Sequence, residues 1–155
     1  MTTAIGLPIL DSSLFIPELR PKKREAALHE MAILAHEMGA VRDPELLFET
    51  LVLRERLAGS GVGKGVAIPN TRSVAVVEPR LMVARSRRGI SWHSHDGQPV
   101  HLVLLALSPS ECSEEAHHEL LSRALDAVRL QRSRQKLLGA PGFDAVATVL
   151  RQVWA

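Results

Sequence analysis

The chain has 155 residues, 46% of them hydrophobic, which suits a single domain large enough for a packed core. Its formal net charge of +2, with 23% charged residues, describes a mixed surface and gives little reason to expect a polyanionic partner. One cysteine excludes an internal disulfide, and the longest apolar run, Leu102 to Leu107, is too short to cross a bilayer. The first residues also lack the basic segment of a secretion signal. We therefore expect a cytoplasmic protein with no membrane insertion and no transport machinery of its own.

The first part of the chain predicts a short strand and a helix. Residues 1–13 have no clear period and are expected to be loosely ordered, so the domain is placed at residues 14–155. The segment 14–16 predicts a first strand, which Pro17 ends. Apolar residues recur near helical spacing from 22 to 38, and Gly39 supplies a stop, so we expect a helix with one packed face. On this helix, His29 and His36 are interpreted as surface residues.

A second helix is predicted to begin after Asp43. An aspartate can cap a helix, and Pro44 follows at the first helical position, where its missing N–H costs nothing. Arg54 and Glu55 lie one turn before the expected end at Gly59. A guanidinium at this place suits the geometry of a phosphate, and the alternative is a surface arginine paired with a nearby glutamate. The expected apolar side comprises Leu46, Leu47, Thr50, Leu51 and Leu57.

Four glycines at alternate positions, from Gly59 to Gly65, follow this helix. Glycine tolerates positive φ and lets the backbone approach a bound group, so the loop can aim N–H groups at an anion. The segment 66–68 then predicts a buried strand that stops at Pro69 and leaves Asn70 at a strand end. A flexible connection without a ligand is the alternative. The candidate anion-binding residues of the loop are Ser60, Gly61 and Gly63.

The loop fails both common nucleotide-binding patterns. A Walker loop needs a glycine five residues before the Gly-Lys pair and a Ser or Thr after it, but those positions hold Ala58 and Gly65. The dinucleotide fingerprint needs glycines at the first, third and sixth positions after a strand, whereas this loop spaces them by two and follows a helix. Neither pattern therefore supports nucleotide binding, and no cofactor is expected.

The region after the loop predicts three strands. Segments 74–77 and 81–84 are rich in β-formers and are separated by a Glu-Pro-Arg turn signal. The arginines that follow are interpreted as a solvated strand end and not as a nucleic-acid site, because the chain has only 3% aromatic residues and no nucleic-acid motif. The most hydrophobic strand, 100–107, is expected to be central in the sheet. The basic residues concerned are Arg85, Arg87 and Arg88, with a second stretch at Arg129, Arg132, Arg134 and Lys136, for which an acidic protein partner is the alternative.

Histidines and one cysteine in this half are weighed as ligands or nucleophiles. His93 and His95 would share a face on a strand, but neither a Cys pair nor a suitably spaced carboxylate accompanies them, so no metal site is expected. A long helix is predicted from Ser113, with acidic residues in its first turn and two histidines, His117 and His118, close behind. Cys112 is interpreted as inert. Residues 143–153 predict a last amphipathic helix, anchored by a tryptophan.

Several motifs along the chain, taken together and in order, are specific enough to indicate a protein family. Five motifs occur in a fixed order: the Arg54-Glu55 pair, the run GSGVGKGVAIPN, the turn DGQPV, the strand HLVLLALSP and the helix containing Ala116-His117. Together they resemble the enzyme IIA domains of the fructose, mannitol and nitrogen-regulatory branch of the bacterial phosphotransferase system, over about residues 15–154. The resemblance implies an α/β fold, with a mixed sheet covered by helices on both faces. Lys64 stands where that family commonly has asparagine.

The resemblance also implies a site. In that family a histidine follows the proline, takes a phosphoryl group from phosphorylated HPr and passes it to a cysteine of enzyme IIB. The resemblance places Arg54 in the phosphoryl pocket. It places His117, with a one-residue uncertainty toward His118, as a second histidine that bonds the acceptor or the phosphoryl oxygens. The position after Pro69 holds Asn70 in this chain.

This substitution changes the expected chemistry. A neutral imidazole has an unshared nitrogen pair that can attack phosphorus, whereas a carboxamide nitrogen shares its pair with the carbonyl. Asn70 can hydrogen-bond as an imidazole does, but we do not expect it to carry a phosphoryl group.

Three functions remain open at this point. The first is a stand-alone relative of the nitrogen-regulatory enzyme IIA that acts through protein contacts, with an HPr-like phosphocarrier, a kinase or a transporter as partner. The second is a phosphoryl carrier that accepts on His117 or His118. The third is a sensor that binds a small anion with Arg54, the glycine loop and His117.

Overall fold

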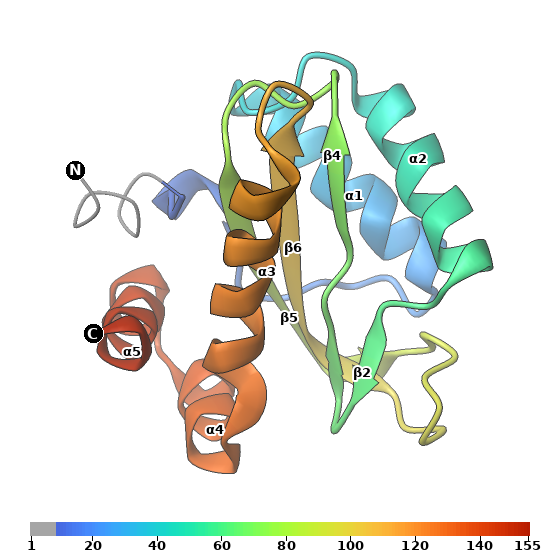
Figure 1. Ribbon diagram of the computed structural model, residues 1–155. Coiled ribbons are helices and arrows are strands. Elements are labelled where there is room, and N and C mark those ends of the chain that lie inside the picture. Colours follow the sequence, from blue (N-terminus) through green and yellow to red (C-terminus); the bar gives the residue numbers. More distant parts are fainter. Residues whose placement is uncertain (1–8) are drawn as a thin grey trace.

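The computed structural model describes residues 9–155. Figure 1 shows a central sheet with α1 and α2 on one face and α3, α4 and α5 on the other. The expected α/β architecture, with helices on both faces of a mixed sheet, is confirmed. We predicted a loosely ordered segment at residues 1–13. Residues 1–8 of that segment lie outside the described residues. Within the described part, Ile9 is buried and its carbonyl accepts from Leu81 N at 2.8 Å.

The helices begin where local signals predict. The Asp43 carboxylate accepts from Leu46 N at 3.0 Å, and the Ser113 hydroxyl accepts from Ala116 N at 3.1 Å, so both are N-caps. The first helix ends before Gly39, whose φ is +81°. The helical segments are a 3-10 turn at Ser12–Leu14, α1 (Arg24–Glu37), α2 (Pro44–Leu57), α3 (Glu114–Arg129), α4 (Gln131–Gly139) and α5 (Phe143–Trp154).

The strands form one six-stranded mixed sheet of order β1-β5-β6-β3-β2, with β4 also paired to β6. As expected, β6 is central: it pairs antiparallel with β5 and parallel with β3 and β4. The hairpin of β2 and β3 forms one edge. The strands are β1 (Phe15–Ile16), β2 (Gly61–Gly63), β3 (Val66–Ala67), β4 (Asn70–Ser73), β5 (Arg80–Ile90) and β6 (Val100–Pro109).

Two apolar cores lie on the two faces of the sheet. Residues of β6 alternate between them: Val103 and Leu105 join the core with α1 and α2, and Leu102 and Leu104 join the core with α3 to α5. Apart from His101, the side chains of β6 are buried, which fits a strand covered on both faces.

Several predicted details are wrong. No strand forms at 74–77, where Val74 is 62% exposed, and the strand lies instead at β4, so Asn70 begins a strand. Leu57, assigned to the packed side of α2, is 77% exposed. Arg85 is not a solvated strand end, because its Nη1 donates to three carbonyls at the end of α4. In each case a tertiary contact, or its lack, overrides local propensity.

Over the described residues, no helix has the length and apolarity needed to cross a membrane.

Candidate functional site

Three side chains from three elements meet at Asn70. Asn70 is the first residue of β4, in register with Ala106 of β6, and follows Pro69 in the short connection between β3 and β4. Arg54 lies in the last turn of α2 and His117 in the first turns of α3. The sheet register and the two helix ends thus bring together residues that are 16 and 47 positions apart.

The carboxamide of Asn70 is held on both sides. Its Oδ1 accepts from Arg54 Nη2 at 3.3 Å and contacts His117 Nε2 at 3.1 Å, while its Nδ2 donates to the Ile68 carbonyl at 3.3 Å. Because an amide oxygen only accepts, His117 carries its proton on Nε2 and donates it to Asn70. The other ring nitrogen, Nδ1, lies 2.8 Å from the Ser108 hydroxyl and accepts from it. The amide and both ring nitrogens therefore have partners.

His117 is kept neutral by its surroundings. Its side chain is buried, and burial is the main cause that lowers its pKa below the usual 6.5. The positive charges of Arg54, His118 and Arg72 lower the pKa of His117 in the same direction. Arg72 is fixed nearby through Nη1, which donates to the Cys112 carbonyl at 2.7 Å. The site is therefore electropositive around a neutral imidazole.

The glycine loop is a clamped hairpin. Lys64 and Gly65 turn it with φ values of +59° and +78°, and the Asp96 carboxylate accepts from Lys64 N at 2.9 Å. That bond and a second one from Gln98 N lower the pKa of Asp96. At Gly61 a Cβ atom would overlap the Ser94 hydroxyl oxygen, so any larger residue would require Ser94 to move.

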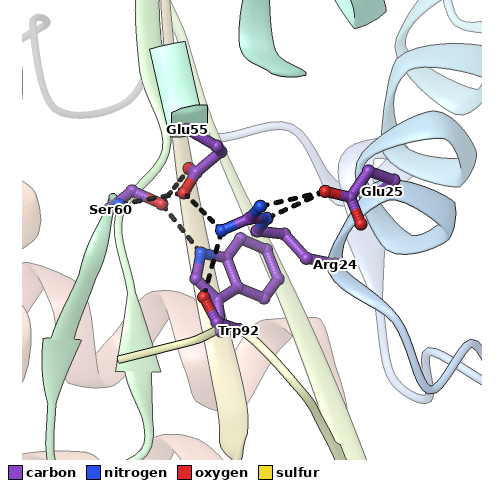
Figure 2. A network of polar contacts seen from close by, with 5 residues as sticks. All are labelled: Arg24, Glu25, Glu55, Ser60 and Trp92. Carbon is purple, nitrogen blue, oxygen red and sulfur yellow. Dashed lines mark hydrogen bonds and ion pairs between the residues drawn. The ribbon is translucent and has the colours of Figure 1, made fainter. Parts of the chain in front are cut away.

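A network of polar groups under the loop was missed by sequence reasoning (Figure 2). Glu55 is buried, and its carboxylate accepts from both the amide and the hydroxyl of Ser60; the amide bond is 3.0 Å long. Trp92 Nε1 donates to the same hydroxyl at 3.0 Å. Arg24 from α1 lies 3.7 Å from Glu55 and donates to the Trp92 carbonyl at 3.2 Å. The network joins α1, α2 and the loop, and the sequence carries no local signal of this burial.

These bonds determine what the loop can bind. The amides of Ser60 and Lys64 donate to protein carboxylates and are not available to an external anion. Of the site residues predicted from the sequence, Arg54, Asn70 and His117 converge, and Pro69 places Asn70. Ser60, Gly61 and Gly63 instead shape the adjoining loop, and within the described residues the exposed His118 makes no hydrogen bond to Asn70.

A hollow with apolar walls opens beside this cluster. A cavity of about 370 Å³ lies between α2, the glycine loop and α3, and Arg54 and Asn70 line it. Around it Leu57, Val62 and Leu125 are 77%, 50% and 49% exposed. Exposed large apolar side chains gathered around a hollow are typical of interaction sites. We call these three residues the apolar rim.

Comparison with known proteins now decides the family. The model described as "Phosphoenolpyruvate-dependent sugar phosphotransferase system, EIIA 2" matches residues 8–153. The chain belongs to this EIIA type-2 family. A solved structure similar to it throughout is the crystal structure of nitrogen regulatory protein IIA-Ntr from Neisseria meningitidis, with a TM-score of 0.84, 28% identity, and coverage of 94% of this chain and 98% of that one.

The relatives of this EIIA chain include nitrogen-regulatory and fructose-specific members. A nitrogen regulatory protein of Bradyrhizobium diazoefficiens is 33% identical over 147 residues, which cover 93% of this chain and 95% of that protein. The fructose-specific EIIABC component of Bacillus subtilis is 31% identical over 134 residues, which cover 86% of this chain but 21% of that protein. The chain thus spans about a fifth of the length of that fructose-specific relative and nearly the whole of the nitrogen regulatory protein.

Proposed function

We propose that this IIA-Ntr-like protein is a cytoplasmic regulatory module that binds protein partners and carries no phosphoryl group at the usual position. The observation that carries the proposal is Asn70, a carboxamide held between Arg54 and His117 where the family resemblance expects the acceptor histidine. A carboxamide nitrogen is a poor nucleophile, so the pocket keeps its donors but lacks an attacking atom.

The contacts of His117 disfavour the second hypothesis, in which His117 accepts the phosphoryl group. Its Nε2 proton is donated to Asn70, and the Nδ1 lone pair points at the Ser108 hydroxyl. A histidine nucleophile needs an unprotonated nitrogen open to the incoming phosphorus. His117 therefore supports Asn70 as a hydrogen-bond donor.

The surface around Asn70 supports docking of a protein. The apolar rim adjoins a second hollow, which Val62 and Leu125 share with three cations and one carboxylate. These charged residues are Lys64, Arg129, Arg134 and Asp126. An apolar patch bordered by cations suits a partner whose own apolar patch is bordered by carboxylates. The partners that we propose for this face are an HPr-like phosphocarrier and, as a regulatory target, a kinase or a transporter.

The test is phosphoryl transfer to matched variants. The native chain and Asn70→His are each incubated with HPr that has been phosphorylated by enzyme I and radiolabelled phosphoenolpyruvate. We expect no acid-labile label on the native chain. We expect label on Asn70→His, because the new imidazole lies beside Arg54 and His117. Label on Asn70→His would show that phosphorylated HPr recognises this surface. The lack of label on the native chain would then be due to the missing acceptor and not to a failure of HPr to bind.

The variant His117→Ala separates the alternatives. If the native chain takes up label at a rate comparable with Asn70→His and loses it in His117→Ala, the chain is a phosphoryl carrier and the proposal is wrong. The proposal would also be wrong if the native label persisted in His117→Ala but disappeared in His118→Ala, because His118 would then be the acceptor.

A further inference from the structure

One side of α2 carries a stripe of apolar side chains that the fold leaves uncovered. The helix packs against α1 and lies at the margin of the molecule in Figure 1. Leu46 and Leu53 are 37% and 54% exposed, and Leu57 is more exposed still. Thr50, which is half-buried, lies between them on the same side. We call these four residues the α2 stripe. Several large apolar side chains exposed together are typical of a surface that packs on another protein.

The spacing of the α2 stripe is that of a coiled-coil seam. Its residues stand four, three and four positions apart, so they fall within about 60° of the helix circumference. This spacing is the same when it is read from either end. A reversed copy of the helix therefore places its Leu57 against Leu46 and its Leu53 against Thr50. A surface that matches itself when reversed fits a two-fold dimer of identical chains.

The charges beside the α2 stripe match in the same arrangement. Glu49 and Arg56 are both exposed and lie on the same flank of the stripe. They are two helical turns apart, about 10 Å, and neither makes an ion pair with another of the described residues. In an antiparallel helix pair, residues on the same flank face each other. Glu49 of each copy therefore lies near Arg56 of the other copy.

A parallel pair would use the charges less well. Glu49 would then face Arg54 of the other copy, whose guanidinium already donates to Asn70. The macrodipoles of two parallel helices also oppose the pairing, whereas those of antiparallel helices favour it. The antiparallel arrangement is therefore the one that fits both the apolar and the charged residues.

We propose that a second copy of this chain docks on the α2 stripe, with the two α2 helices antiparallel across a two-fold axis. The stripe is about 16 Å long, so the contact is smaller than a standard interface of about 1,600 Å². We therefore expect a weak dimer, with a dissociation constant of about 100 µM.

The dimer has a consequence for the Asn70 site. Leu57 belongs both to the α2 stripe and to the apolar rim, so the second copy covers part of the proposed docking surface. Dimerisation and docking of a different protein on the apolar rim then exclude each other. The dimer itself does not depend on whether the proposed function is correct.

The test is sedimentation equilibrium of the full native chain under reducing conditions, which keep Cys112 from cross-linking. The concentration series reaches about tenfold above the expected dissociation constant. We expect the average mass to rise from the monomer value of 17.0 kDa toward twice that value. A mass that stays at the monomer value throughout the series would overturn the proposal.

A first pair of variants locates the contact. Leu53→Asp should weaken the dimer about tenfold or more, because an apolar residue at the centre of the contact becomes charged. Its melting temperature should stay close to that of the native chain, since the side chain is exposed. Leu138→Asp, at an exposed leucine of α4, should dimerise as the native chain does. Equal weakening in both variants, or none in Leu53→Asp, would refute docking on the α2 stripe.

Charge reversal tests the antiparallel arrangement. Glu49→Arg and Arg56→Glu should each weaken the dimer about fivefold, because each brings like charges together. The double variant, with both reversals, should recover most of the native affinity. The two positions are too far apart to pair within one helix, so recovery reports a contact between chains. A double variant as weak as the single variants would rule out the antiparallel pairing.

The exclusion of docking has a separate readout. With phosphorylated HPr at a fixed concentration, the labelling rate per chain of Asn70→His should fall as that chain is concentrated above the dissociation constant. Leu53→Asp in the same background should remove this fall. A rate that falls equally with and without Leu53→Asp would show that dimerisation does not block docking. Sedimentation tests the dimer without labelling, so its failure and that of the proposed function can be told apart.

Discussion

At the scale of single residues, two side chains determine the local chemistry and conformation. His117 is buried as a neutral ring between Asn70 and Ser108. Lys64 occupies a left-handed backbone conformation, with φ of +59°, at the turn of the glycine hairpin. Both residues affect the free energy of unfolding: His117 through its protonation and Lys64 through its backbone conformation.

His117 should make stability depend on pH. Its folded-state pKa lies below the unfolded value of 6.5, so as pH falls through 6.5 the unfolded chain binds the proton first and the free energy of unfolding decreases. His117→Gln should flatten this decrease between about pH 7 and pH 5. Urea denaturation at several pH values measures this slope. An unchanged slope in His117→Gln would contradict the assignment of a buried neutral ring.

Lys64 should be replaceable with a gain in stability. A residue with a Cβ pays about 1 kcal/mol in the left-handed region, and asparagine tolerates it better than lysine. Lys64→Asn should therefore raise the free energy of unfolding by about 0.5 kcal/mol. Lys64→Gln removes the same charge without this preference and should give no gain. Equal effects of the two substitutions would indicate that charge, and not the φ angle, matters at this turn.

At the scale of elements, Glu55 connects α2 to the glycine loop. Its carboxylate receives both donors of Ser60 and lies beside Arg24 of α1 (Figure 2). A buried carboxylate is tolerated only with such partners, and neutralising it leaves the guanidinium of Arg24 with weaker compensation. The glycine loop next to Asn70 is thus held at two points: Glu55 binds it at Ser60, and Asp96 binds it at Lys64.

Glu55→Gln should therefore destabilise the protein. The volume is retained but charge-assisted hydrogen bonds are lost, so the free energy of unfolding should fall by about 2 kcal/mol. Glu49→Gln, an exposed position on the same helix, should change it by less than about 0.5 kcal/mol. Chemical denaturation measures both. Similar small effects in the two variants would show that the network contributes nothing to stability.

At the scale of the whole molecule, several exposed apolar side chains lie outside the two packed cores, around the first cavity beside the site. Leu57 is 77% exposed, and Val62 and Leu125 are about half exposed next to the first cavity. Large apolar side chains in such numbers around one hollow favour an interface with a partner protein. Asn70 lines the cavity at this surface, which we propose as the docking site.

Leu57→Asp should weaken docking without weakening the fold. In the Asn70→His background, labelling by phosphorylated HPr should slow by about tenfold, since loss of a central apolar contact typically costs more than 1 kcal/mol. The melting temperature should be nearly unchanged because the side chain is exposed. Leu138→Asp, also at an exposed leucine but on α4, is the control and should label normally. Equal slowing in both variants would contradict a docking role for the apolar rim.

Local chemistry allowed much of the fold to be predicted. The caps at Asp43 and Ser113, the stop at Gly39 and the central hydrophobic strand all depend on neighbours in the chain, and all are found. The strand expected at 74–77 is absent because β4 pairs with β6 just before it, at Asn70–Ser73. Pairing partners are distant in sequence, so strand propensity alone misplaced this element.

The sequence by itself determined the family motifs, the helix ends and the amide at position 70, since each is a property of residue type and short-range spacing. Only the tertiary structure decided that Arg54 and His117 both bond to that amide and that Glu55 is buried under the loop. These contacts join residues from different elements. Their geometry depends on sheet register and helix docking, which no local pattern encodes.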